Sequence, residues 1–179
     1  MHFDTQESYS YITKVLHWIR VFLLINIYCL AWIGDGSYFY MHKIFGSLLF
    51  IIIVISIVWR IFNIYPQSTA SSIVEKNIQY LIYIFIYTLL LIIPIFGYLG
   101  SPNGVYLYFF NLPSLYYIKC INDIVINYIG VSIKDFAMVM KFMHKVIVQW
   151  ILLALIFLHI LAIIFNLIVK KHNDIKRMI

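Results

Sequence analysis

Four histidines lie within or at the ends of long apolar stretches of this 179-residue chain: His17, His42, His144 and His159. An ionisable side chain inside an apolar segment is costly, and such a residue predicts a functional role. A single histidine of this kind is also explained by packing at a helix interface, with a hydrogen bond to a neighbour. Four of them together favour a shared chemical task, provided that the helices that carry them bring them together.

The apolar stretches are long enough to cross a bilayer, which takes about 20 residues. The chain is 64% hydrophobic and only 11% charged, and this composition excludes a soluble or disordered protein. We therefore predict an all-α integral membrane protein, in which residues 1–179 form one domain, a four-transmembrane-helix bundle. The predicted spans cover residues 11–33, 41–62, 78–99 and 142–169.

The distribution of Lys and Arg predicts the orientation of these spans, because cytoplasmic ends are richer in both residues. Of the 13 Lys and Arg residues, eight lie on the side of the two tails and the second linker, and five lie on the other side. Both termini are therefore expected in the cytoplasm. The net charge of +6 then reflects helix anchoring rather than nucleic-acid binding. Cys29 and Cys120 are expected to be unpaired.

In this topology the histidines form two pairs, His17 with His159 in the cytoplasmic leaflet and His42 with His144 in the outer leaflet. Two facing imidazoles without a nearby carboxylate or thiol suit the axial positions of a haem iron, whereas zinc takes three or four protein ligands. His144 and His159 are 15 residues apart, which is about 22 Å along a helix and too far for one iron. The pattern predicts two b haems, both ligated by the fourth span. Gly46, one turn after His42, would leave room for a macrocycle.

The sequence resembles the bacterial cytochrome b561 family over nearly its whole length, including the superoxide-oxidising and hydrogenase cytochrome b-like members. The matching motifs are K-x-x-H-W at 14–18, H-K-x-x-G at 42–46, W-R at 59–60, P-x-x-G at 94–97, N-L-P at 111–113, K-x-x-H at 141–144, the second histidine of the fourth span at 159, and the closing R-M at 177–178. The resemblance implies a dihaem membrane cytochrome b of the bacterial inner membrane, with the same two pairs of ligands. It also implies electron transfer between a donor and membrane quinone, as in respiratory electron transport.

The chain departs from the family pattern at several positions. Tyr83 stands where relatives often carry a histidine, Lys145 where they usually have a glutamate, and Ser56 where a second arginine is common. The two histidines of the fourth span are also one residue further apart than expected, and a π-bulge would absorb the extra residue.

Four cations lie near the histidines in the sequence. Arg20 comes one turn after His17 and points to a similar face. It would either pair with a propionate of the cytoplasmic-side haem or extend to the headgroups. Lys43, Lys141 and Lys145 cluster around the outer pair. They would either steer a small anion such as superoxide toward it or anchor helix ends in the headgroups.

We interpret the chain as a membrane redox protein that moves electrons from an outer-side donor, superoxide or a redox protein partner, to quinone in the lipid bilayer. An interfacial aromatic residue such as Trp18 or Trp150 would lie near the quinone. Acting alone, the chain would be an enzyme, a superoxide:quinone oxidoreductase. In a larger dehydrogenase complex it would be a relay subunit. The competing hypotheses are a haem-free transporter or anchor and a metal permease, and the sequence assigns no catalytic residue.

Overall fold

Four long helices dominate the computed structural model, which describes residues 3–5, 8–33, 36–63, 66, 72–101, 104–107, 110–171 and 175–178. They are α1 (Tyr11–Ile33), α2 (Gly36–Ile61), α3 (Ile73–Leu99) and a fourth helix made of three consecutive parts. Those parts are α5 (Ile133–Phe142), a π-helical turn (Met143–Val148) and α6 (Gln149–Ile168). All four helices are long and apolar enough to cross a membrane. The predicted four-span, all-α membrane fold is confirmed.

The helices extend beyond several of the predicted spans. The first span was predicted with its observed bounds, but α2 and α3 each begin five residues earlier than predicted and the fourth helix nine earlier. Apolar runs mark only the hydrocarbon crossing, whereas a helix also continues where its polar side chains reach water. Serine caps fix two of these starts, because the Ser72 and Ser132 hydroxyls accept hydrogen bonds from the backbone N–H groups of Glu75 (3.2 Å) and Asp135 (3.1 Å).

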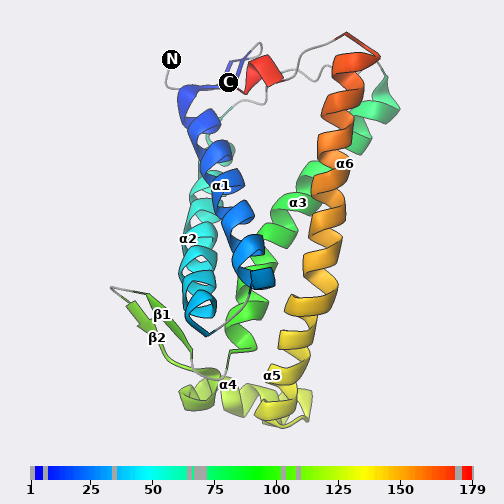
Figure 1. Cartoon of the computed structure of the whole chain (residues 1–179). Coiled ribbons are helices and arrows are strands. Elements are labelled where there is room, and N and C mark those ends of the chain that lie inside the picture. The colour runs from blue at the N-terminus through cyan, green and yellow to red at the C-terminus, as the bar shows by residue number, and fades with distance from the viewer. Residues whose placement is uncertain are drawn as a thin grey trace.

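Figure 1 shows α1 and α2 side by side, with α3 crossing obliquely behind them toward the fourth helix. Both chain termini lie at one end of the bundle, here named the terminal end. An ion pair between Glu75 and Lys170 joins the start of α3 to the fourth helix. The opposite end, named the hairpin end, carries the antiparallel strands β1 (Val105–Leu107) and β2 (Phe110–Leu112), a 3-10 turn (Leu115–Tyr117), α4 (Lys119–Ile124) and a second π turn (Val125–Ile129).

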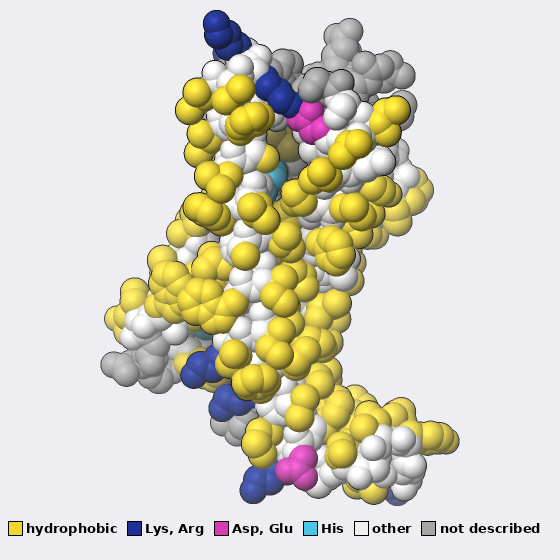
Figure 2. All heavy atoms as spheres, turned by 90° about the vertical axis from the view of Figure 1, so that its right-hand side faces the viewer, with side chains coloured by type: hydrophobic (Ala, Val, Ile, Leu, Met, Phe, Trp, Pro, Cys, Tyr) yellow, Lys and Arg dark blue, Asp and Glu magenta, His cyan; other side chains and the backbone are white. Residues whose placement is uncertain are grey.

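The buried core lies midway between the two ends of the bundle. It consists of Leu23, Leu49, Ile53, Leu90 and Leu152, so every spanning helix contributes to it. Most other apolar side chains face outward, as lipid-facing residues do, and Figure 2 shows them as a broad hydrophobic surface with Lys and Arg near its two ends. Cys29 and Cys120 are both free, as predicted.

A buried carboxylate fastens the N-terminal segment to the terminal end. The Asp4 side chain accepts hydrogen bonds from the Ser10 backbone N–H (2.7 Å) and the Thr13 hydroxyl (2.7 Å), and pairs with the Arg60 guanidinium (3.0 Å). The indole N–H of Trp59 donates to the same Thr13 hydroxyl (2.9 Å). Burial alone would raise the pKa of Asp4, but the hydrogen bonds from Ser10 and Thr13 and the charge of Arg60 outweigh it and lower that pKa. The W-R motif therefore closes the end of α2 onto the start of α1.

We expect Asp4→Asn to destabilise the protein by about 3 kcal/mol, because it leaves the Arg60 charge without its buried partner. The control is Asp135→Asn at an exposed helix start, which should cost less than about 1 kcal/mol. Since the folded state lowers the pKa of Asp4, the contribution is complete at neutral pH and is lost only as the pH falls through that lowered value, below 3.8. Thermal unfolding in detergent at several pH values measures both effects, and equal losses in the two variants would contradict the role of Asp4.

Candidate functional site: two histidine pairs

His42 and His144 face each other near the hairpin end, as predicted for the outer-leaflet pair. Their ring centroids are 6.1 Å apart and their planes cross at 89°. An imidazole nitrogen binds a metal at about 2 Å and the ring centre lies about 1.2 Å behind it, so two rings on opposite sides of one metal have centres about 6.3 Å apart. The observed separation therefore suits two axial ligands of one iron.

The backbone fixes which nitrogen of each ring is available. His42 Nδ1 lies 3.1 Å from the Ile27 carbonyl oxygen, and His144 Nδ1 lies 2.7 Å from that of Ile93. A carbonyl oxygen only accepts hydrogen bonds, so each Nδ1 carries the proton and donates it. The lone pair of each Nε2 is then free to bind a metal, the arrangement typical of metal-ligating histidines.

The two rings line one narrow cavity together with Gly46 and Pro94. A side chain at Gly46 would meet nothing within 4 Å, so the cavity holds open space beside His42. The cavity measures about 40 Å³, and flanking side chains must separate when a flat macrocycle enters. With this movement, the donor set and the glycine fit a haem.

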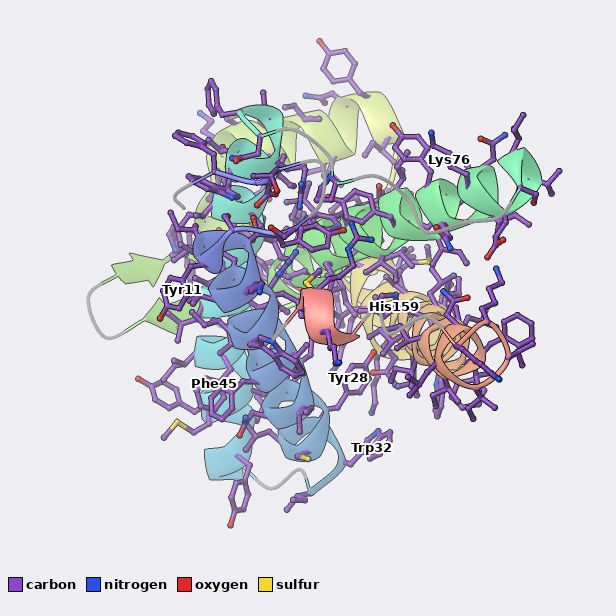
Figure 3. All side chains as sticks on the ribbon, turned by 90° about the horizontal axis from the view of Figure 1, so that it is seen from above. Tyr11, Tyr28, Trp32, Phe45, Lys76 and His159 are labelled. Atoms are coloured by element: carbon purple, nitrogen blue, oxygen red, sulfur yellow. The ribbon has the colours of Figure 1, made fainter. Side chains whose placement is uncertain are left out.

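His17 and His159, the pair predicted nearer the termini, come from α1 and α6. They lie close enough to interact electrostatically, and the His17 ring contacts the Trp18 ring edge-on at 5.5 Å. Seen from the terminal end, His159 lies on the side of α6 that faces α1 (Figure 3). Figure 2 shows a hollow near the same end with a histidine side chain visible inside. His159 is exposed, whereas His42 and His144 are half-buried, so this pair is less enclosed than the first. Within the described residues, no three His, Cys, Asp or Glu side chains group as a metal cluster.

Arg20 lies inside the bundle, with only 8% of its surface exposed. Its Nε donates to the Leu16 carbonyl (3.0 Å), and its guanidinium lies 4.8 Å from the centre of the Tyr87 ring on α3. Tyr87 in turn packs against Tyr83, at 4.6 Å between ring centroids. The alternative that Arg20 extends to the headgroups is therefore wrong, and its charge acts within the bundle, close to His17.

The three lysines near the hairpin-end pair differ in environment. The Lys43 ammonium donates to the Ser101 hydroxyl (2.9 Å) and the Gly104 carbonyl (3.0 Å), so it fastens the loop that follows α3. Lys141 and Lys145 are exposed. Of these three lysines, Lys141 and Lys145 therefore present their charges outward.

A shallow cavity of about 520 Å³, open over most of its extent, lies on the outer face of α1 near the terminal end. Trp18 forms one wall, and its indole N–H donates to the Met178 carbonyl (2.7 Å), which brings the end of the chain against α1. The lining is almost wholly apolar apart from the Lys14 side chain: Tyr11, Lys14, Val15, Trp18, Ile19, Phe22 and Met178. Because Trp18 also contacts His17, this cavity adjoins the terminal-end pair.

Sequence reasoning missed the groups that orient the histidines. The carbonyls of Ile27 and Ile93 are backbone atoms, which no residue type reveals. The Tyr28 hydroxyl, which donates to the Gln149 carbonyl (2.9 Å) beside the narrow cavity, gave no signal either. The P-x-x-G motif was a usable signal, because its Gly97 contacts the His144 ring. The proposed π-bulge is confirmed as the turn Met143–Val148, which contains His144.

Two comparisons with known proteins bear on this arrangement. A family model described as prokaryotic cytochrome b561 matches residues 8–179, a range that includes all four spanning helices and both histidine pairs. No individually curated protein matches the chain.

Proposed function

Since the chain belongs to the prokaryotic cytochrome b561 family, whose members are membrane b-type cytochromes that transfer electrons, we propose that it binds two b haems and carries electrons across the bilayer. His42 and His144 would hold the iron of the hairpin-side haem, and His17 and His159 that of the terminal-side haem. The observation that carries this proposal is the 6.1 Å separation of His42 and His144, with both Nδ1 atoms bonded to carbonyls.

Haem supplies the one-electron chemistry, and the protein supplies ligation, orientation and a low-dielectric surrounding. The four imidazoles lie in two pairs, one toward each end of the bundle, with the apolar core between the pairs. The Arg20 guanidinium would pair with a propionate of the terminal-side haem, because a desolvated cation gains most from an anionic partner. Both termini lie on the cytoplasmic side of a bacterial inner membrane, so the hairpin end is the outer end.

The electron donor approaches the outer end, where Lys141 and Lys145 attract a small anion such as superoxide. Each superoxide that gives up one electron leaves as dioxygen. The acceptor is membrane quinone, which takes up two electrons and two protons to become quinol. We place its headgroup in the cavity beside Trp18, because that cavity opens toward lipid and Trp18 contacts His17.

Histidine substitutions test the two-haem assignment. His144→Ala and His159→Ala should each remove one of the two haems. Because each pair shares one iron, His42→Ala should lose the same haem as His144→Ala, and His17→Ala the same haem as His159→Ala. Pyridine haemochrome analysis of the purified proteins gives the count, with His2→Ala in the N-terminal tail as the control. Full haem content in both fourth-helix variants would overturn the assignment, and a wild-type chain without any b-type spectrum would favour the haem-free transporter or anchor.

Steering by lysines predicts a salt-dependent reaction with superoxide. Lys141→Gln combined with Lys145→Gln should slow haem reduction several-fold at low salt, because these two lysines supply part of a steering effect that can reach about 10- to 1,000-fold. The difference should shrink at high ionic strength, because salt screens exposed charges over about 8–10 Å. Stopped-flow absorbance measures the rate, and Lys134→Gln, two turns before Lys141 on α5, is the control. If the rate of haem reduction changes neither with salt concentration nor with the two lysine substitutions, the chain is instead a relay subunit that receives its electrons from a protein partner.

Filling the cavity beside Trp18 should block the acceptor without disturbing the haems. We expect the reduced haems of Ile19→Trp to be reoxidised by a short-chain quinone about tenfold or more slowly than those of the wild type. A tenfold effect corresponds to about 1.4 kcal/mol of lost interaction free energy with the quinone. Ile151→Trp, on a lipid-facing position of α6, is the matched control and should stay within about twofold of wild type, a change of under about 0.5 kcal/mol. Haem content should remain unchanged in both variants. Equal quinone rates would place the acceptor elsewhere.

A further inference from the structure

Two glycines at the end of α3 let the fourth helix approach very closely. A Cβ atom on Gly97 would lie 2.9 Å from Cε1 and 3.0 Å from Nδ1 of His144. A Cβ atom on Gly100 would lie 2.7 Å from the backbone nitrogen of Lys141. The φ angle of Gly100 is −88°, an ordinary value, so space, and not backbone strain, excludes a side chain there. Side-chain-free surface on α3 therefore faces the segment that carries the outer ligand.

The same stretch of α3 also binds the His144 ring. The Ile93 carbonyl, one turn before Gly97, accepts the hydrogen bond from His144 Nδ1 at 2.7 Å. One ring edge is thus hydrogen bonded to α3, and the neighbouring Cε1 edge is in contact with Gly97. His144 itself belongs to the π turn, whose wider backbone changes the direction of its side chains relative to a regular α-helix. Together these contacts restrict the His144 ring to one orientation.

We propose that α3 sets the plane of the His144 ring, with Gly97 as the positioning residue, and that the two axial imidazoles of the outer haem are therefore held crossed. The crossing angle is that of the two rings in the structure, 89°. His42 is held independently by the Ile27 carbonyl of α1, so a change at Gly97 turns one ring against a fixed partner. This inference rests on the proposed function for the presence of haem, but concerns the orientation of the ligands alone.

Crossed imidazoles have a spectroscopic consequence that ligation alone does not. Each imidazole interacts with the iron d orbital perpendicular to its own plane. Crossed planes therefore leave two d orbitals of low-spin ferric iron nearly equal in energy, and parallel planes separate them. Near-equal energies give a strongly anisotropic EPR signal with a single large g value, and separated energies give a rhombic signal with three resolved values.

The experiment is low-temperature EPR of the oxidised holoprotein. The wild type should show a strongly anisotropic low-spin signal that disappears in His42→Ala. In Gly97→Ala that signal should lose its large g value or become rhombic, the outer haem potential should shift, and the signal of the other haem should persist. Gly130→Ala is the control, because its methyl group meets no atom within 4 Å while its left-handed backbone (φ 75°) adds general strain. Its EPR spectrum should match that of the wild type.

The outcomes separate this inference from the proposed function. A chain without two haems contradicts the proposed function itself. If the chain binds two haems but the EPR signal that disappears in His42→Ala is rhombic, the crossed orientation is wrong. This result comes from the wild type and His42→Ala, so it decides the question even if Gly97→Ala does not fold. Two haems and an unchanged outer signal in Gly97→Ala contradict the role of Gly97.

Discussion

An imidazole at membrane depth has two ring nitrogens to satisfy and no water with which to do so. In the hairpin-end pair the backbone satisfies one nitrogen of each ring, through the carbonyls of Ile27 and Ile93. A carbonyl oxygen has two lone pairs, so accepting this bond does not require a helix to lose its own hydrogen bond. Each remaining nitrogen, Nε2, keeps an available lone pair, and α1, α3 and the π turn surround the two rings and hold them in this arrangement.

This constraint also explains why the second and fourth helices alone cannot make the site. His42 is hydrogen bonded to α1 and His144 to α3, so each proposed ligand is oriented by a helix that carries neither histidine of that pair. Metal ligands are commonly oriented by such outer groups. The glycines of α3 contribute by leaving space and the π turn by absorbing one residue, and both features lie where the fourth helix approaches α3 most closely.

The sequence predicted the features that depend on composition and helical spacing. Apolar runs identified the four spans, and counting depth along them paired His42 with His144 correctly. Helix starts were predicted late, because Ser72 and Ser132 extend helices into the polar zone. The ion pair of Asp4 with Arg60 and the hydrogen bonds of Lys43 to Ser101 and Gly104 could not be predicted, since their partners lie in segments distant in sequence. The β-hairpin was also unpredicted, because its aromatic run suits a membrane interface as well as a strand.

The two histidine pairs differ in their electrostatic surroundings, and on the proposed assignment of two haems this difference would favour one direction of electron flow. A bis-histidine b haem loses one positive charge when it is reduced, so a nearby cation favours the reduced state. Arg20 is buried beside the terminal-end pair, where a low dielectric strengthens its effect. Near the other pair, Lys43 is half-buried and Lys141 and Lys145 are exposed, so water and salt weaken the effect of these charges more than that of Arg20. On the proposed assignment, Arg20 raises the potential of the terminal-side haem relative to the outer one, and an electron that enters at the hairpin end moves energetically downhill toward the cavity beside Trp18.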